Sequence, residues 1–311
     1  MVENRFDVTV IGSVGIDTNI YFYGAGPDFE VESNFTENID YVGQAGGYAS
    51  RGYAQLGKKT AFIGYLGDDH LGQLIRDDFA HDGIDMTGMS IDPMGTKRSI
   101  NFMFADGRRK NFYDGKGNMQ LHPDLEACRS ILSKSRLAHF NIPNWARHLL
   151  PLTWELGLTV AVDLQDIVSV DDPYRQDFIH QADILFFSAV NYDDPKPLIQ
   201  ALLGIKPDLI VVSGIGVRGC ALGTQNGVRC FPAVEMEKPV IDTNGAGDAL
   251  AVGFLSSYVL DGFSLEESIL RGQIAARHSC TLKASTSNLI TMKQLEPYYS
   301  DMRQSRDDPK R

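Results

Sequence analysis

Two periods of hydrophobicity alternate along most of the chain, and this alternation constrains the fold more than any other feature. Short apolar runs are typical of buried strands, and amphipathic stretches of helical length lie between them. The predicted strands are 6–11, 61–65, 137–141, 159–163, 184–187 and 209–213. The predicted helices include 70–81, 145–156 and 195–203, with further helices from residue 246 onward. Such alternation predicts an α/β fold, in which helices flank a central, mostly parallel sheet.

Two segments, 18–42 and 96–114, break the alternation. Their polar and apolar residues alternate, and turn signals such as Asp106-Gly107 are typical of β-hairpins. We expect the two hairpins to pair as a small β-sheet lid. The basic run Arg108-Arg109-Lys110 then lies at a hairpin tip, either as a solvated edge or as a substrate contact.

The remaining segments form the predicted core. It comprises residues 1–17, 43–95 and 115–304 and is expected to bind both nucleotide and substrate. Residues 305–311 are polar and terminal, so they are expected to be disordered.

Charge and composition exclude several classes of partner. The chain of 311 residues is 43% hydrophobic and 22% charged, as in globular proteins, and its net charge is −11. Phosphate backbones and anionic membranes require clustered Lys and Arg, so neither nucleic acid nor membrane is expected as a partner. We find no apolar run long enough to span a bilayer, no signal peptide and no Cys-x-x-Cys pair. These features predict a cytoplasmic protein with reduced thiols.

The segment most informative about function reads Asp242-Thr243-Asn244-Gly245-Ala246-Gly247-Asp248 and opens a predicted helix. Small residues at a helix N-terminus leave several backbone N–H groups free to bind a phosphate. Asp248 would lie close to the group that receives the phosphate and could accept the proton of an attacking hydroxyl. The structural alternative is a helix capped by the two aspartates. The length of the string favours phosphoryl transfer.

This string resembles the C-terminal signature of the PfkB, or ribokinase-like, carbohydrate kinase family. Residues 12–17 (GSVGID), 62–72 (FIGYLGDDHLG) and 216–219 (GVRG) resemble other family motifs in the same order. The similarity extends from residue 6 to about residue 284. It implies a ribokinase-like fold, Mg-ATP as the phosphoryl donor, and a sugar or sugar-like hydroxyl as the acceptor.

The resemblance implies roles for individual residues of the string. Asp248 corresponds to the catalytic base. Gly245, Ala246 and Gly247 correspond to the anion hole that holds the transferred phosphate. Asp242 corresponds to a ligand of a monovalent cation, so K⁺ is a further expected cofactor.

Other motifs correspond to the nucleotide and substrate sites. Gly216 and Gly219 match a loop that contacts the nucleotide. Asp17 matches an acid that hydrogen-bonds substrate hydroxyls, although an Asx turn explains the same residue locally. Arg98 lies on the predicted lid, where relatives contact substrate.

The first family signature, usually Gly-Gly-x-x-x-Asn, departs from the pattern here. Counting back from Leu56-Gly57, it begins at Gly43, and Gln44 and Tyr48 replace the second glycine and the asparagine. These three residues are expected to line the substrate pocket. Tyr48 could stack on a substrate ring or could simply pack in its helix.

A second departure concerns Mg²⁺. Relatives carry Asn-x-x-Glu after the strand 184–187, whereas this chain has Ser188 and Asn191 at the first and last positions, without the carboxylate. Asp166, Asp193 or Asp194 could compensate. Ala284 stands where relatives have a glycine near the adenine, and we expect Ser188, Asn191 and Ala284 in the nucleotide site.

Three functions are consistent with these motifs. The first is an ATP-dependent sugar kinase, and the second is a nucleoside kinase on the same fold, because Gln44 and Tyr48 are compatible with a base-bearing acceptor. The third is a non-catalytic ligand-binding relative, which the missing metal acid suggests and the intact string around Asp248 opposes. Lids with open strand edges often pair between subunits, so a homodimer is also expected.

Overall fold

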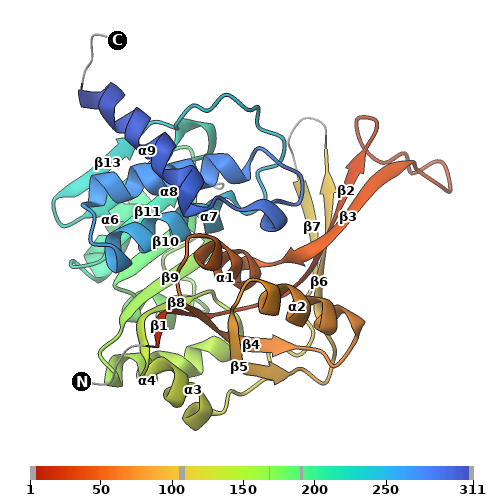
Figure 1. Cartoon of the computed structure of the whole chain (residues 1–311), viewed down its shortest axis with the longest axis horizontal. Coiled ribbons are helices and arrows are strands. Elements are labelled where there is room, and N and C mark those ends of the chain that lie inside the picture. Colours follow the sequence, from red (N-terminus) through yellow and green to blue (C-terminus); the bar gives the residue numbers. More distant parts are fainter. Residues whose placement is uncertain (1–4, 105–108, 168, 190–191, 308–311) are drawn as a thin grey trace.

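The computed structural model describes residues 5–104, 109–167, 169–189 and 192–307, and Figure 1 shows their arrangement. Two β-sheets organise the chain, and we call the four-stranded one, formed by β2, β3, β6 and β7, the small sheet. The strands are β1 (Phe6–Ile11), β2 (Gly15–Phe22), β3 (Thr36–Gly43), β4 (Thr60–Leu66), β5 (Asp85–Ile91), β6 (Lys97–Met103), β7 (Arg109–Asp114), β8 (Ser135–Phe140), β9 (Thr159–Asp166), β10 (Ile184–Ser188), β11 (Ile210–Gly214), β12 (Cys220–Thr224) and β13 (Gly227–Phe231). The helices are α1 (Ala45–Gln55), α2 (His70–His81), α3 (Leu125–Leu132), α4 (Leu150–Glu155), α5 (Gln176–Gln181), α6 (Lys196–Ile205), α7 (Ala246–Leu255), α8 (Leu265–Ser279) and α9 (Met292–Asp307), with short turns η1 (Asn144–Leu149), η2 (Gly216–Arg218), η3 (Ser256–Leu260) and η4 (Ser285–Asn288).

The large sheet has nine strands in the order β13-β12-β11-β10-β9-β8-β1-β4-β5. The pairs from β11 to β5 are parallel, and β12 and β13 add an antiparallel edge. The central strands are apolar and almost completely buried, as a sheet covered on both faces requires. Their carboxyl ends therefore meet at one edge, where α/β folds bind ligands.

Helices cover both faces of this sheet, and each face has its own apolar core. Residues of α1, α2, α7, α8 and α9 form the core on one face, and residues of α3, α4, α5 and α6 form it on the other. The predicted α/β, ribokinase-like architecture with a small second sheet is confirmed. Within the described part of the chain, no helix is both long and apolar enough to cross a membrane.

The small sheet consists of two hairpins that pair through their inner strands. β2 pairs antiparallel with β3, β6 pairs antiparallel with β7, and β2 and β6 run parallel. The two predicted hairpins therefore do pair in space, although β2 begins at Gly15 rather than at residue 18 and β3 extends to Gly43. Figure 1 shows this sheet projecting from the core beside α1 and α2. The predicted turn at Asp106-Gly107 and the basic residue Arg108 lie outside the described residues.

Several elements differ from the sequence-based expectation. The helix predicted at 145–156 is divided into η1 and α4, because Pro151 has no N–H and is tolerated only in the first turn of a helix. The edge strands β5 and β13, and β12 beside β13, were missed, although Asn226-Gly227 at the turn into β13 is a hairpin signal. α9 continues to Asp307, so residues 305–307 of the expected disordered tail are helical, and 308–311 lie outside the described residues.

Candidate active site

Asp248 lies in the first turn of α7, where the N-terminus of the helix opens onto the carboxyl edge of the large sheet. The helix begins after Gly245, which adopts the left-handed conformation with φ of 78°. Among the described residues, the N–H groups of Gly245 and Gly247 have no acceptor, and Ala246 makes only a 3.3 Å bond to the Thr243 carbonyl. This geometry leaves backbone donors available for an anion.

The Asp248 carboxyl is partly shielded from solvent beside these amides. The residue is half-buried, but its Oδ1 is shielded from solvent and has no hydrogen-bond partner in the described chain. Burial raises the pKa of Asp248 well above its ordinary value, the negative charges of Asp163 and Asp17 act in the same direction, and the Arg109 guanidinium opposes them. An acid with a raised pKa in a ligand-accessible position is typical of a general base or acid.

Asp163 and Asp17 complete an acidic cluster with Asp248. Asp163 lies in the carboxyl-terminal half of β9 and is 5% exposed, and burial raises its pKa. Burial also raises the pKa of Asp17 to about 6, although the Gln44 amide, Ser99 and the Arg109 charge oppose the shift. Sequence reasoning identified Asp17 and Asp248 but missed Asp163, whose signal was its place at the end of a predicted strand.

Gly43 and Gln44 shape the site around Asp17. A Cβ on Gly43 would overlap the Asp17 carboxyl, so only glycine allows this approach. The Gln44 N–H donates to Asp17 Oδ2 at 3.2 Å. Gln44 itself has φ of 60°, a conformation that is unusual for a residue with a side chain. Its position was predicted to be in the substrate pocket, and the structure brings it beside Asp17.

Several buried polar atoms around Asp17 have no hydrogen-bond partner among the described residues. They include Asp17 Oδ1, both amide atoms of Gln44 and both amide atoms of Asn141, a residue that follows β8. Buried polar groups are normally paired, so such atoms mark a place where a polar ligand or water completes the bonding. Asn141 was not identified from the sequence.

Arg109 extends from the small sheet to the loop before α7. Its guanidinium donates to Asn244 Oδ1, and its charge acts on both Asp17 and Asp248. Arg109 is exposed, but it lies on the same face of the small sheet as Asp17, so the substrate-contact interpretation of the basic run stays a prediction. A lone cation beside an acidic cluster is suited to stabilise additional negative charge there.

Tyr48 is buried, with 4% of its surface exposed, and it packs against the loop before α7. A Cβ on Gly245 would overlap the Tyr48 ring, and the Tyr48 hydroxyl donates to the Tyr41 hydroxyl at 3.0 Å. Ala284, with φ of 50°, belongs to the same apolar cluster as Tyr41 and Tyr48. The structure thus places Tyr48 and Ala284 in a packed cluster that supports the loop.

Asp242 is held by the small sheet. Its Oδ2 accepts hydrogen bonds from Asn19 Nδ2 at 3.0 Å and from the Tyr21 hydroxyl at 2.6 Å. Its Oδ1 accepts from the Asn244 backbone at 2.8 Å. Asn19 and Tyr21 were not identified from the sequence, although with Asp17 they follow the two-residue period of one face of β2.

The predicted nucleotide residues lie at the ends of neighbouring strands. Ser188 ends β10, and Gly216 and Gly219, with φ of 62° and 101°, flank the turn after β11. An added Cβ on Gly216 would meet nothing within 4 Å, so the loop is open to an approaching ligand. Asn191 lies outside the described residues.

Arg98 is an exception among the predicted site residues. It alternates with Ser99 on β6, and its Nη2 donates to Thr18 on the face of the small sheet that is opposite to Asp17. Because successive side chains of a strand point to opposite faces, the structure does not bring Arg98 to the site.

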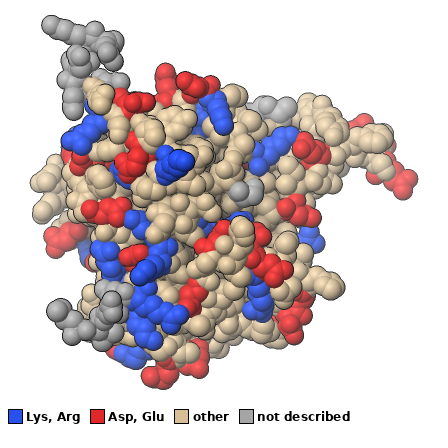
Figure 2. All heavy atoms as spheres, in the orientation of Figure 1, with Lys and Arg blue, Asp and Glu red and all other residues tan. Residues whose placement is uncertain are grey.

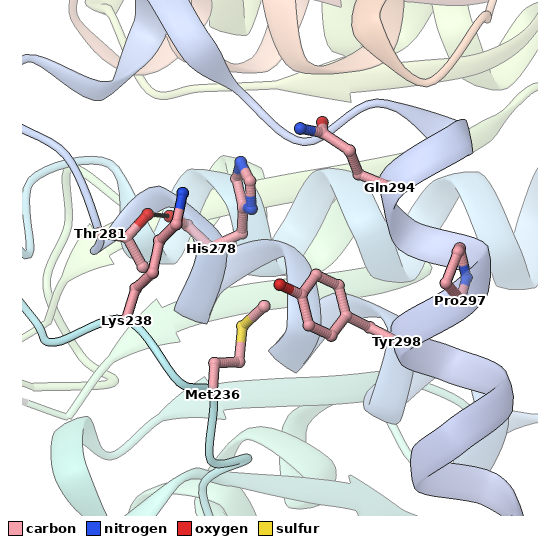
Figure 3. Close-up of a pocket in the computed structure, with 7 residues that line it drawn as sticks. All are labelled: Met236, Lys238, His278, Thr281, Gln294, Pro297 and Tyr298. Carbon is pink, nitrogen blue, oxygen red and sulfur yellow. Dashed lines mark hydrogen bonds between the residues drawn. The ribbon is translucent and has the colours of Figure 1, made fainter.

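A separate cavity of about 320 Å³ lies between α8, α9 and the segment before Asp242. Figure 3 shows His278 of α8 and Tyr298 of α9 lining it, together with Lys238. None of the residues predicted to bind substrate or nucleotide lines this cavity.

Asp248 at the start of α7 therefore interacts electrostatically with Asp17 of the small sheet and with Asp163 of β9. The sequence profile described as pfkB family carbohydrate kinase matches residues 5–292. The chain belongs to the PfkB carbohydrate kinase family. It is therefore a phosphotransferase that acts on a hydroxyl of a sugar-type acceptor, as expected from the motifs.

Individual PfkB relatives support this membership. An acarbose 7(IV)-phosphotransferase of Actinoplanes sp. is 29% identical over 294 residues, covering 93% of this chain and 97% of the relative. A 5-dehydro-2-deoxygluconokinase of Bacillus subtilis is 26% identical over 322 residues, covering 94% and 96%. Among solved structures, the microbiome-derived acarbose kinase Mak1 superposes with a TM-score of 0.85 at 27% identity, covering 95% of this chain and 99% of Mak1.

Proposed function

We propose that this PfkB kinase transfers the γ-phosphoryl group of ATP to a hydroxyl of a sugar or sugar-like acceptor, with Asp248 as the general base. The observation that carries the proposal is the shielded Asp248 Oδ1 beside the backbone amides of Gly245 and Gly247, none of which has a hydrogen-bond partner among the described residues. The acceptor oxygen attacks the γ-phosphorus, its proton passes to Asp248, and the bond to the β-phosphate oxygen breaks to release ADP.

The small sheet would act as a lid over this reaction. Asp17 on β2 of this sheet and Gln44 directly after β3 offer acceptors and donors for several hydroxyls. Arg109 would bring a positive charge to the transferred phosphate, and closure would exclude water that competes with the acceptor. The core would comprise 1–17, 43–95 and 115–304, and the lid 18–42 and 96–114.

Cations would assist in different ways. Mg²⁺ would neutralise charge on the ATP phosphates, and the mutual repulsion among Asp17, Asp163 and Asp248 fits a site that a cation completes. Asp163 is the carboxylate best placed to hold it through water, since Asp248 serves as the base. Asp242 would hold K⁺ through Oδ1, which accepts one hydrogen bond, since Oδ2 already accepts two.

A panel of acceptors tests the proposed function. Relatives named for acarbose and 5-dehydro-2-deoxygluconate make these compounds the first acceptors to test, followed by ribose, fructose and adenosine. We expect ADP release that depends on a carbohydrate acceptor and exceeds hydrolysis in water, measured with a coupled assay and by ³¹P NMR of the product. Turnover of adenosine alone would instead support the nucleoside kinase, and no turnover of any alcohol would support a non-catalytic relative.

A homodimer through the lid is the second proposal, and the outer face of the small sheet supports it. A groove of about 560 Å³ is lined there by aromatic side chains including Phe29, Phe102 and Phe112, and Phe29 and Phe112 are 85% and 51% exposed. Figure 2 shows that the projecting sheet carries few charges on the visible face, except at its acidic tip. Exposed aromatic grooves of this kind often mark interfaces.

Light scattering tests this interface. We expect the wild-type protein to have twice the 34.4 kDa mass of the chain and Phe112→Asp to shift it to the monomer. The control is Leu74→Asp on α2, which places the same charge at a 42% exposed leucine away from the groove. A monomeric wild-type protein at micromolar concentration would disprove the dimer.

A further inference from the structure

A buried polar network joins the small sheet to the loop that forms the anion hole. We call it the Tyr41 network, and its members are Tyr41, Tyr48, Asn19, Asn244 and Asp242. Each of these residues is at most 7% exposed. The network connects strands β2 and β3 and helix α1 with the residues immediately before Gly245.

The Tyr41 hydroxyl is the centre of the network, and all its hydrogen-bonding capacity is used. It donates to Asn19 Oδ1 at 3.1 Å and accepts from Tyr48 at 3.0 Å and from Asn244 Nδ2 at 2.6 Å. A hydroxyl offers one donor and two acceptor sites, so Tyr41 is fully satisfied. Such a saturated buried group fixes the relative positions of its partners more strongly than a surface bond does.

Asp242 and Asn244, which precede the proposed anion hole, both form hydrogen bonds with residues of the small sheet. Asn244 is bonded to Tyr41 on β3 and to Arg109 on β7, and Asp242 is bonded to Asn19 and Tyr21 on β2. Tyr48 adds a steric support, because its ring fills the space that a Cβ on Gly245 would need. Thus the start of α7 is positioned largely by residues of the sheet that also carries Asp17.

We infer that Tyr41, together with Tyr48, is a positioning residue that holds the anion hole in register with the acceptor site. This inference rests on the proposed function, since it assigns the network a role in phosphoryl transfer. Neither tyrosine contacts the reacting atoms. Their effect is to make the conformation of residues 242–247 depend on the position of the small sheet, so that acceptor binding beneath Asp17 favours the phosphate-binding conformation.

Tyr41→Phe is the main test. It removes only the hydroxyl and leaves the Asn244 amide and the Tyr48 hydroxyl without their partner. We expect kcat to fall about tenfold, because small misplacements of a phosphate site are costly, while the KM for the acceptor changes less than about twofold. Hydrogen exchange of peptides that cover 242–248 should become faster by at least about fivefold, with or without turnover.

Tyr53→Phe is the matched control. Tyr53 lies on α1 as Tyr48 does, is fully buried, and donates or accepts one side-chain hydrogen bond with His139 Nδ1 at 3.1 Å. The Tyr53→Phe variant should lose about as much thermal stability as Tyr41→Phe. Its kcat and the hydrogen-exchange rate of residues 242–248 should stay as in the wild type. Tyr48→Phe should show the kinetic and exchange effects in weaker form, because its ring still supports Gly245.

The exchange measurement separates this inference from the proposed function. If the wild type shows no phosphotransfer, the proposed function fails, and faster exchange of 242–248 in Tyr41→Phe still supports the structural coupling. Unchanged exchange in Tyr41→Phe, or equal changes in Tyr53→Phe, would overturn the inference. A KM for the acceptor that rises while kcat stays constant would also overturn it, since that result indicates direct substrate binding by Tyr41.

Discussion

Asp248→Asn is expected to lower kcat by about 10²–10⁴-fold, because the amide keeps the size of the carboxylate but cannot accept the acceptor's proton. The KM values for ATP and for the carbohydrate should change only a few-fold, since the side chain binds neither in the proposed scheme. Steady-state kinetics with the best acceptor of the panel would measure both quantities.

The thermal stability of this variant provides an internal control. In the wild type, the carboxyl is unfavourable beside Asp163 and Asp17, as its raised pKa indicates. Removing its charge should therefore leave the melting temperature unchanged or raise it, so lost activity could not be attributed to unfolding. A variant that retains kcat within about threefold would show that another group is the base.

Gly245→Ala is expected to have the second-largest effect. The residue has φ of 78°, where a side chain costs about 1–2 kcal/mol, and the added Cβ would overlap the Tyr48 ring. The loop must then shift, and the loss of an aligned backbone donor should lower kcat by about 10²–10³-fold. Kinetics and thermal unfolding would be measured together.

Gly262→Ala is a matched control for the backbone strain. Gly262 has φ of 77°, but an added Cβ would meet nothing within 4 Å, and the residue lies at the far end of α7 and η3. This variant should lose stability from strain alone and keep full activity. If Gly245→Ala kept its kcat and lost no more stability than Gly262→Ala, the proposed role of the loop would be wrong.

Local features of the sequence were sufficient for much of the fold. The predicted strand 6–11 and helix 70–81 coincide with β1 and α2, because a buried strand and an amphipathic helix each leave a distinct period in the sequence. The edge strands β5 and β13 were missed, since half-exposed strands lack a continuous apolar run. A hairpin with a strong turn signal can be predicted without such an apolar run, and Asn226-Gly227 could have predicted the hairpin of β12 and β13.

Some residues of the candidate site could likewise be predicted from the sequence, and others could not. Asp17 and Asp248 were identified because each belongs to a contiguous motif, in which the chemistry and the spacing appear together. Asn141 and Asp163 were not identified, and Arg109 was left between a solvated edge and a substrate contact, because each belongs to a different strand or strand end. Nothing local distinguishes such residues from ordinary polar residues.

The sequence by itself determined the family, the α/β architecture, and the position of the helix that begins at Ala246, because these depend on short segments whose residues interact with near neighbours. Only the tertiary structure decided that Asp242 and Tyr48 support the loop before α7, that Arg98 faces away, and that Arg109 lies on the same face of the small sheet as Asp17. These roles depend on contacts between residues that are 80 or more positions apart in the sequence. Contacts between residues so far apart in the sequence are determined by the packing of the whole fold, so no local sequence pattern predicts them.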